Sequence, residues 1–237
     1  MPAFKKNDTF GYYSHIPKVG GTSITKYMQD NGFKLWLQGD CGTQEEFQPL
    51  VRNRPWSKGW VPPDNSPCNR HHWHAALANT YIKLEDIEFK FAVLRDPVER
   101  MVSEYQYRKK KYINPIHAYE WFQNEQAAAR CAENVLETAT DFSVWLNNNY
   151  ECYTLYNYVW DNHFRPQSEF VPKGAKTFKF REWSLLQEYI RQAFDVEGKF
   201  PHVNGSGTLN VTPTKEDRAL IEKWYKEDYE LIESIEQ

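Results

Sequence analysis

The chain has 237 residues, a formal net charge of −3, and 41% apolar, 26% charged and 16% aromatic residues. This length and composition favour one globular domain over residues 1–237 with a full hydrophobic core. The weak negative charge argues against nucleic acid as a partner, and no apolar run approaches the ~18 residues of a membrane span. The segment MPAFKKNDTF lacks the apolar centre of a signal peptide. We therefore expect a cytoplasmic protein with no membrane partner, unless the chain is an excised catalytic domain.

The four cysteines are Cys41, Cys68, Cys131 and Cys152, and none of them forms a Cys-x-x-Cys pair. This spacing is not that of a metal site. We expect free thiols in a reducing compartment.

Strands and helices are expected to alternate along the chain, which predicts an α/β protein with a parallel sheet. The first half contains predicted strands over 10–16, 33–37 and 90–94 and helices over 22–31 and 97–110. The second half contains predicted helices over 116–136, from Asp141 to the asparagine run 147–149, over 183–195, and from Thr212 and Pro213 to the C-terminus, with a strand over 177–180. Residues 38–70 are rich in Pro, Gly, Asn and Trp and are expected to form an irregular insertion.

A strand, a Gly-containing turn and a helix start follow one another in Tyr12–Ile24. This arrangement directs backbone N–H groups and a helix N-terminus at one point, which is how proteins hold phosphate. Glycines allow close approach of the backbone, and a lysine supplies a cation. The candidate ligands are Lys18, Gly20, Gly21, Thr22 and Ser23. The alternative is a Gly-rich turn that only packs a helix on a sheet.

Two side chains that can contact phosphate stand where the strand over 90–94 ends and the next helix begins. Arg95 follows the strand, and Ser103 stands eight residues later on the predicted helix. An arginine fork can reach phosphate oxygens from a strand end, and a serine hydroxyl can add a further hydrogen bond. The alternative is a structural ion pair between Arg95 and Asp96 at the corner between strand and helix.

Three histidines, His71, His72 and His74, lie within four residues. No carboxylate or cysteine stands at a usual ligand spacing from them, so the sequence predicts no metal site. A neutral imidazole can instead take a proton from a hydroxyl group. The alternative is a set of ordinary loop histidines on the surface or in the core.

The order His-Ile-Pro-Lys-x-Gly-Gly-Thr-Ser at 15–23 resembles the 5′-phosphosulfate loop of sulfotransferases, most closely the heparan sulfate and chondroitin carbohydrate branch. The segment 94–105 resembles the 3′-phosphate motif of the same family. The resemblance implies a P-loop-like three-layer α/β fold with a central parallel sheet flanked by helices. It also implies 3′-phosphoadenosine 5′-phosphosulfate (PAPS) as donor co-substrate, no metal, and a hydroxyl-bearing acceptor such as a carbohydrate.

By this resemblance Lys18 stabilises charge on the bridging oxygen as the sulfuryl group leaves, and Arg95 and Ser103 contact the 3′-phosphate. The implied ligands of the 5′-phosphate are Gly20, Gly21, Thr22 and Ser23. In the uronyl and heparan 2-O-sulfotransferase branch a His-x-His motif precedes the Arg-Asp-Pro segment. This implies His74 as the catalytic base and His72 as its neighbour, or the reverse, and gives His71 no counterpart.

Two downstream segments also resemble the family. The segment 162–168 is similar to a motif that lines the acceptor side, and 200–207 to a loop over the 3′ end of the nucleotide, which places Asn204 and Ser206 near the donor. Acceptor specificity is expected in the insertion 38–70 and in a mainly helical region over 112–170. The acceptor itself and the oligomeric state are not readable from the sequence.

Two other functions remain open. A P-loop-like nucleotide kinase would require the order GxxxxGK[ST], whereas here the lysine precedes the glycines; Asp96 could still hold Mg²⁺. A non-catalytic nucleotide-binding protein could also keep the fold. The basic run 108–111 ends a predicted helix and is expected to form a solvated face.

Overall fold

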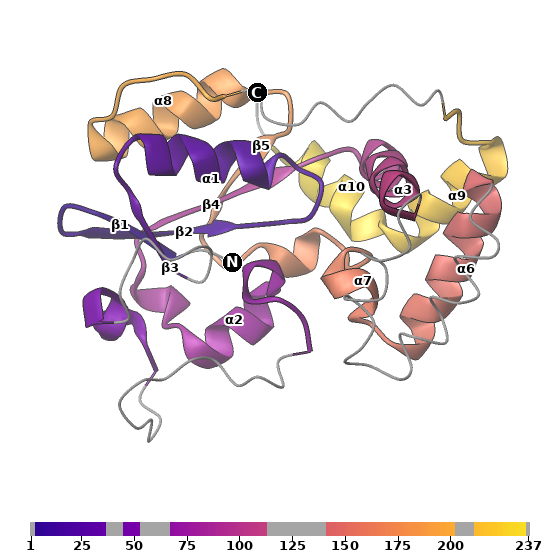
Figure 1. The fold of residues 1–237 in the computed structure, drawn as a ribbon, viewed down its shortest axis with the longest axis horizontal. Helices are drawn as coiled ribbons and strands as arrows, with labels where there is room; N and C mark the ends of the chain where they lie inside the picture. The colour runs from indigo at the N-terminus through magenta and orange to yellow at the C-terminus, as the bar shows by residue number, and fades with distance from the viewer. Residues whose placement is uncertain (1–2, 37–44, 53–66, 113–140, 202–210, 236–237) are drawn as a thin grey trace.

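The computed structural model describes residues 3–36, 45–52, 67–112, 141–201 and 211–235 (Figure 1). Five strands form one sheet in the order β3-β1-β2-β4-β5. The strands are β1 (Ala3–Lys6), β2 (Thr9–Ser14), β3 (Lys34–Trp36), β4 (Phe89–Leu94) and β5 (Lys176–Lys179). β4 pairs in parallel with β2 and β5, whereas β1 pairs antiparallel with β2 and β3. The predicted α/β class is confirmed, and the centre of the sheet is parallel as expected.

The antiparallel strand β1 is not evident in the sequence pattern. It forms a hairpin with β2 in which Lys6 pairs with Thr9 and Asn7 adopts a left-handed conformation with φ 54°. The two-residue loop is Asn-Asp, which lacks the glycine that makes such turns recognisable.

Helices cover both faces of the sheet and extend beyond one end of it (Figure 1). They are α1 (Gly21–Asp30), α2 (Ala75–Tyr81), α3 (Pro97–Tyr112), α6 (Phe142–Leu155), α7 (Val159–Asn162), α8 (Trp183–Phe194), α9 (Lys215–Trp224) and α10 (Lys226–Glu233), with 3₁₀ turns η1 (Glu45–Leu50), η2 (Arg70–His72), η3 (Leu84–Asp86) and η4 (Ser168–Phe170). In Figure 1, α1 and α8 lie on one face and α2 on the other. α3, α6, α9 and α10 form a group beyond the carboxyl ends of β2 and β4.

The buried apolar side chains form two clusters. The larger one lies around the sheet, where every residue of β4 is buried, as expected for a central parallel strand. The smaller one joins α3, α6 and α9 through side chains such as Trp145 and Tyr225. Buried Arg100 of α3 donates to the carbonyls of His163 and Arg165, at 3.3 and 3.0 Å, and so joins this second cluster to the chain that follows α7.

The predicted end of the helix after Asp141 is wrong. Asp141 caps the helix as expected, accepting from the backbone N–H groups of two residues in the first turn. The helix does not stop in the asparagine run, because Asn147 and Asn149 donate back to the carbonyls four residues earlier, at 2.8 and 2.7 Å. Buried Asn149 also accepts from the indole of Trp160. Asparagines with such partners no longer compete with the helix, so α6 continues to Leu155.

The final helix also differs from the prediction. Its cap is Thr214 rather than Thr212, because Thr214 and Asp217 form a reciprocal capping box. The helix is divided at Tyr225, whose hydroxyl donates to the carbonyl of Phe164 at 2.9 Å. The other predicted helices and strands that lie within the described residues are present to within two residues at each end.

Several predictions fall outside the described residues: the helix over 116–136, most of the insertion 38–70 and part of the region 112–170. Cys68 and Cys152 are buried and form no disulfide within the described residues, and the other two cysteines lie outside the described part. Among the helices described, none combines the length and the hydropathy that crossing a membrane requires.

Candidate functional site

The turn after β2 has the geometry of a phosphate loop. Gly20 precedes α1 in a left-handed conformation with φ 86°, and Gly21 is the first helical residue. The first N–H groups of a helix lack partners within the helix and point toward its N-terminal end, where they can bind an anion. Thr22 is exposed there and Ser23 is buried. The structure therefore places the four predicted 5′-phosphate ligands at one helix start.

Both glycines are also required by packing within the protein. A Cβ on Gly20 would stand 2.6 Å from the ring of Trp183, and one on Gly21 would stand 2.0 Å from Nε2 of His15. The glycines therefore serve packing, as the alternative of a packing turn expected. The same turn also has the geometry of a phosphate loop.

Lys18 and Arg95, from the two predicted phosphate motifs, are in direct contact. Arg95 Nη1 donates to the carbonyl oxygen of Lys18 at 3.2 Å. Lys18 has a left-handed backbone with φ 69°, which is uncommon for a residue with a long side chain. Its ammonium lies 4.1 Å from the ring centre of Tyr107 on α3. The side chain thus rests on an aromatic face by a cation–π contact.

Arg95 is fixed from both its backbone and its side chain. Gln167 accepts from the Arg95 N–H at 3.0 Å and donates to the Arg95 carbonyl at 2.8 Å. Asp228 of α10 holds Gln167 in turn, accepting from its backbone N–H at 2.9 Å. The guanidinium lies 4.5 Å from the ring centre of Phe180. The predicted acceptor-side segment 162–168 therefore positions the arginine assigned to the 3′-phosphate.

The alternative ion pair between Arg95 and Asp96 is not among the ion pairs of the described residues. Arg95 pairs with Glu99, with 3.4 Å between Nε and Oε2. Asp96 accepts from the Glu99 backbone N–H at 2.9 Å and so caps the first turn of α3. Residues four apart share one face of a helix, so Glu99 marks one face of α3. This face carries buried Ser103 and then Tyr107, so the predicted 3′-phosphate serine lies between the Arg95 contact and the Lys18 contact.

A buried charged network lies beside Lys18. Glu104 accepts from Arg108 Nε at 2.5 Å and from His163 Nδ1 at 2.8 Å. Burial alone raises the pKa of Glu104, but Arg108, the His163 hydrogen bond and Lys18 hold it well below its ordinary value. Burial lowers the pKa of His163 to about 4. Arg108 is only 3% exposed, so the prediction of a solvated face is wrong for this residue.

Four imidazoles gather around the start of the loop, and we call His15, His71, His72 and His163 the histidine cluster. The ring centre of His72 lies 5.3 Å from that of His15, 4.0 Å from that of His71 and 4.7 Å from that of His163. His15 packs on Gly21, so the cluster adjoins the phosphate loop. Burial and the neighbouring His72 lower the pKa of His71 to about 3.

Asp161 anchors the histidine cluster from a strained turn. Trp160, Asp161 and Asn162 all have left-handed backbones, with φ of 52°, 60° and 69°. Such conformations cost about 1–3 kcal/mol each and persist at sites that the surroundings over-determine. Asp161 Oδ2 accepts from His72 Nδ1 at 2.6 Å, and Asn162 Nδ2 donates to the His72 carbonyl at 2.8 Å. The pKa of Asp161 would be raised by burial but is lowered by His72 and by the Asn69 hydrogen bonds.

His74, the implied base, has its ring contact with Tyr158. It precedes α2, is buried, and its ring centre lies 5.9 Å from that of Tyr158. Its Nδ1 is buried without a hydrogen-bond partner among the described residues. Burial and the nearby Arg165 lower its pKa to about 4.

Sequence reasoning did not single out four residues of the site. Glu104, Tyr107 and Asp161 stand among ordinary helix and loop residues, and Gln167 is visible only through the family resemblance. Tyr107 stands four residues after Ser103 on the predicted helix, and this spacing could have suggested Tyr107 as a site residue. Asn204 and Ser206, predicted near the 3′ end of the donor, lie outside the described residues.

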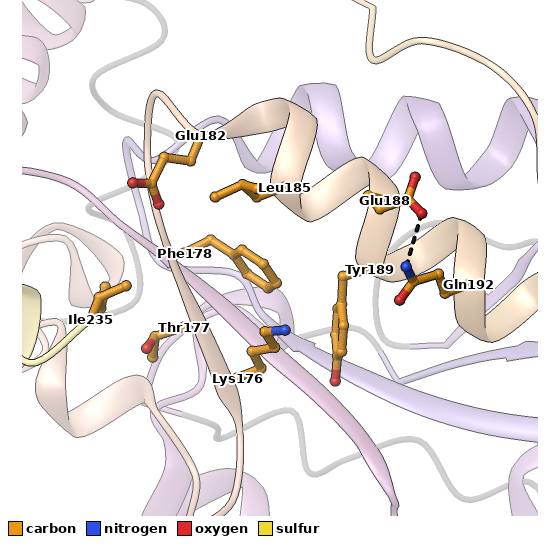
Figure 2. A pocket seen from close by; sticks show the side chains of 9 residues that line it. All are labelled: Lys176, Thr177, Phe178, Glu182, Leu185, Glu188, Tyr189, Gln192 and Ile235. Carbon is orange, nitrogen blue, oxygen red and sulfur yellow. Dashed lines mark hydrogen bonds between the residues drawn. The ribbon is translucent and has the colours of Figure 1, made fainter. Parts of the chain in front are cut away.

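A surface pocket lies elsewhere, between edge strand β5, helix α8 and the C-terminal end (Figure 2). Its lining residues are Lys176, Thr177, Phe178, Glu182, Leu185, Glu188, Tyr189, Gln192 and Ile235. The ammonium of Lys176 lies 4.7 Å from the ring centre of Tyr189, and Glu188 accepts from Gln192 at 2.9 Å. None of the predicted site residues lines this pocket.

The fold and the loop define a P-loop-like α/β protein with a phosphate-type strand–turn–helix. The model of the sulfotransferase family matches residues 12–233, so the chain belongs to the sulfotransferase family, whose members are transferases of sulfo groups. Comparison with curated proteins and with solved structures finds no match.

Proposed function

We propose that the protein transfers a sulfuryl group from PAPS to an acceptor hydroxyl, most suitably one of a carbohydrate. The observation that carries the proposal is the hydrogen bond from Arg95 to the Lys18 carbonyl. It joins the backbone of the predicted 5′-phosphosulfate loop to the arginine of the predicted 3′-phosphate motif, and this contact supports a ligand that spans both motifs. A nucleotide with phosphates at both its 3′ and 5′ positions would contact both, whereas ATP has no 3′-phosphate.

The transfer follows the logic of in-line phosphoryl transfer, in which positioning and charge stabilisation provide most of the catalysis. The acceptor oxygen forms a bond to sulfur as the bond from sulfur to the 5′-phosphate oxygen breaks, and adenosine 3′,5′-bisphosphate leaves. Lys18 stabilises the charge that develops on the leaving oxygen. Gly20, Gly21, Thr22 and Ser23 would hold the 5′-phosphate. Arg95 and Ser103, with Asn204 and Ser206, would hold the 3′ end.

Of the two candidate bases, the geometry favours His72. Its Nδ1 donates to Asp161, which leaves the Nε2 lone pair for the proton of the acceptor hydroxyl. A buried carboxylate in this position orients an imidazole and stabilises the imidazolium that forms. The His72 ring also lies in the histidine cluster beside Gly21, whereas the His74 ring lies against Tyr158.

Thermal melts test the donor. A ligand that binds only the folded state raises the melting temperature, so adenosine 3′,5′-bisphosphate should stabilise the protein and ATP with Mg²⁺ should not. A shift with ATP and none with the bisphosphate would favour a kinase instead. Arg95→Ala should abolish the bisphosphate shift, and the exposed Arg191→Ala serves as its control.

Paired histidine variants test the base. His72→Asn should lower kcat by about 10²–10⁴-fold, the range of general base catalysis, without changing bisphosphate affinity. His74→Asn should retain turnover, measured as transfer of labelled sulfate to a panel of sugar, peptide and small-molecule hydroxyl acceptors. The reverse result would assign the base to His74. The same panel tests the carbohydrate acceptor.

A further inference from the structure

Three side chains of metal-ligand type meet beside the phosphate loop, although they come from distant parts of the chain. The ligand atoms of His71, His72 and Asp161 all lie within 4.8 Å of one another. We propose that these residues form a binding site for a divalent transition metal of the zinc type. We further propose that a bound metal and the use of His72 as base exclude each other; this second part rests on the proposed function.

The donor set selects the kind of metal. Two imidazoles and one carboxylate suit Zn²⁺, Co²⁺ and Ni²⁺, whereas Mg²⁺ prefers oxygen ligands. Three protein ligands on zinc leave a fourth tetrahedral position open for water or another oxygen. The sequence predicted no metal because no carboxylate stands near the histidines along the chain, and Asp161 supplies that carboxylate through the fold.

The site is close to the required geometry. Ligands that bind one tetrahedral zinc with bonds of about 2.0–2.1 Å stand about 3.3 Å apart. His72 Nδ1 and Asp161 Oδ2, at 2.6 Å, would separate slightly if the metal entered between them. The ligand atoms lie at most 4.8 Å apart. Any pair of them must therefore approach by no more than about 1.5 Å to reach the tetrahedral spacing. His71 is half-buried in the middle of the short turn η2, so its side chain can supply this movement.

The carboxylate is held in place independently of any metal. Asn69 donates to Asp161 twice, from its backbone N–H to Oδ1 at 2.5 Å and from its side chain to Oδ2 at 2.7 Å. Each carboxylate oxygen can accept more than one interaction, so capacity for a metal remains. Partners of this kind orient metal ligands. The left-handed turn at 160–162 fixes the carboxylate against the histidine loop.

Metal binding removes the lone pair that catalysis needs, whichever nitrogen is used. A metal on Nε2 of His72 occupies that lone pair directly. A metal on Nδ1 replaces the hydrogen bond to Asp161, and the ring proton then resides on Nε2. In either case His72 cannot accept a proton from a hydroxyl. Zinc therefore acts as a reversible inhibitor at this site.

Binding is tested first, without reference to activity. Metal-free protein is titrated with Co²⁺, and the visible absorption of tetrahedral Co²⁺ is recorded, with Mg²⁺ as the ion that should not compete. Loss of even an outer-shell partner of a metal ligand costs about 10–100-fold in affinity, so His71→Ala should weaken Co²⁺ binding by at least about tenfold. His74→Ala, the matched change two residues away, should bind as the wild type. Equal binding by His71→Ala and wild type would overturn the site.

Inhibition is tested second, as release of adenosine 3′,5′-bisphosphate from PAPS with an acceptor that supports turnover. Zn²⁺ should inhibit, and a chelator should restore the rate. In His71→Ala, inhibition is measured relative to that variant's own metal-free rate, and at least about tenfold more Zn²⁺ should be needed for the same fractional loss. If Co²⁺ binds but bound metal does not lower the rate of transfer, the proposal that metal and the use of His72 as base exclude each other is wrong. Absence of bisphosphate binding and turnover would overturn the proposed function while the Co²⁺ spectrum still supported the site.

Discussion

The phosphate loop and the histidine cluster lie side by side but are built in different ways. The loop is one continuous segment, 17–23, shaped by its own glycines and by the start of α1. The cluster takes His15, His71, His72 and His163 from separate segments and depends on Asp161 and Glu104 to hold them. A contiguous loop keeps its shape through local backbone geometry. An assembled cluster keeps its shape only while buried charges and a strained turn remain paired, so it should respond more strongly to single substitutions outside itself.

The largest effect should come from Glu104, the buried carboxylate that accepts a hydrogen bond from His163 of the cluster. Glu104→Gln leaves Arg108 buried without its anion and should lower the free energy of unfolding by about 3–5 kcal/mol, the cost of breaking a buried pair. Urea denaturation measures it. The exposed pair of Glu188 with Arg191 gives the control, and Glu188→Gln should cost no more than about 1 kcal/mol. Similar losses in the two variants would mean that the network does not support the cluster.

The Glu104 carboxylate should also make the free energy of unfolding depend on pH. The folded-state pKa of Glu104 lies below its ordinary value of 4.5, so its contribution is present above that pH and is lost as the pH falls through the folded-state pKa. Unfolding free energies measured from pH 6 downward should therefore fall more steeply for the wild type than for Glu104→Gln. Parallel curves would contradict the assignment.

The next effect belongs to the loop. Lys18→Ala removes the cation that we propose stabilises the leaving oxygen, and it should lower kcat by about 10²–10³-fold. The affinity for adenosine 3′,5′-bisphosphate should change less, because the backbone N–H groups and Arg95 remain. Calorimetric binding and labelled-sulfate transfer measure the two quantities separately. Equal losses in both would mean that Lys18 only binds the nucleotide.

Asp161→Asn should affect the cluster and spare the loop. Asparagine tolerates the left-handed backbone, so the fold should remain. If His72 is the base as proposed, the amide no longer fixes its tautomer or stabilises its imidazolium, and kcat should fall by about 10²–10⁴-fold, the range of general base catalysis. Bisphosphate affinity should match the wild type. A parallel loss of nucleotide affinity would show that the two regions are not separate in function.

The smallest effect should arise where the two regions touch. Gly21→Ala places a methyl group at the position of the His15 ring and should lower stability by about 1–3 kcal/mol, the usual cost of overpacking. His15→Ala combined with Gly21→Ala should recover part of that loss. Additive losses in the double variant would mean that the ring does not pack on the loop.

The difference between the regions also explains how far the sequence could be interpreted. The turn between β2 and α1, strand β4, the helix begun by Pro97 and the cap at Asp141 follow from patterns within a few residues, and the structure confirms them. The end of α6 could not be predicted, because it depends on a hydrogen bond from Trp160, which follows the helix, to buried Asn149 inside it. The cap at Thr214 was decided by a capping box that competes with the neighbouring Thr212.

The sequence by itself determined the family, the α/β class and the turn between β2 and α1, because these depend on short-range backbone geometry and on residues in a fixed order. Only the tertiary structure decided which carboxylates join the histidines. Asp161 and Glu104 reach His72 and His163 across 89 and 59 residues of chain. No periodicity or spacing encodes such a contact, since it forms only when separate segments are buried together and their charges must find partners.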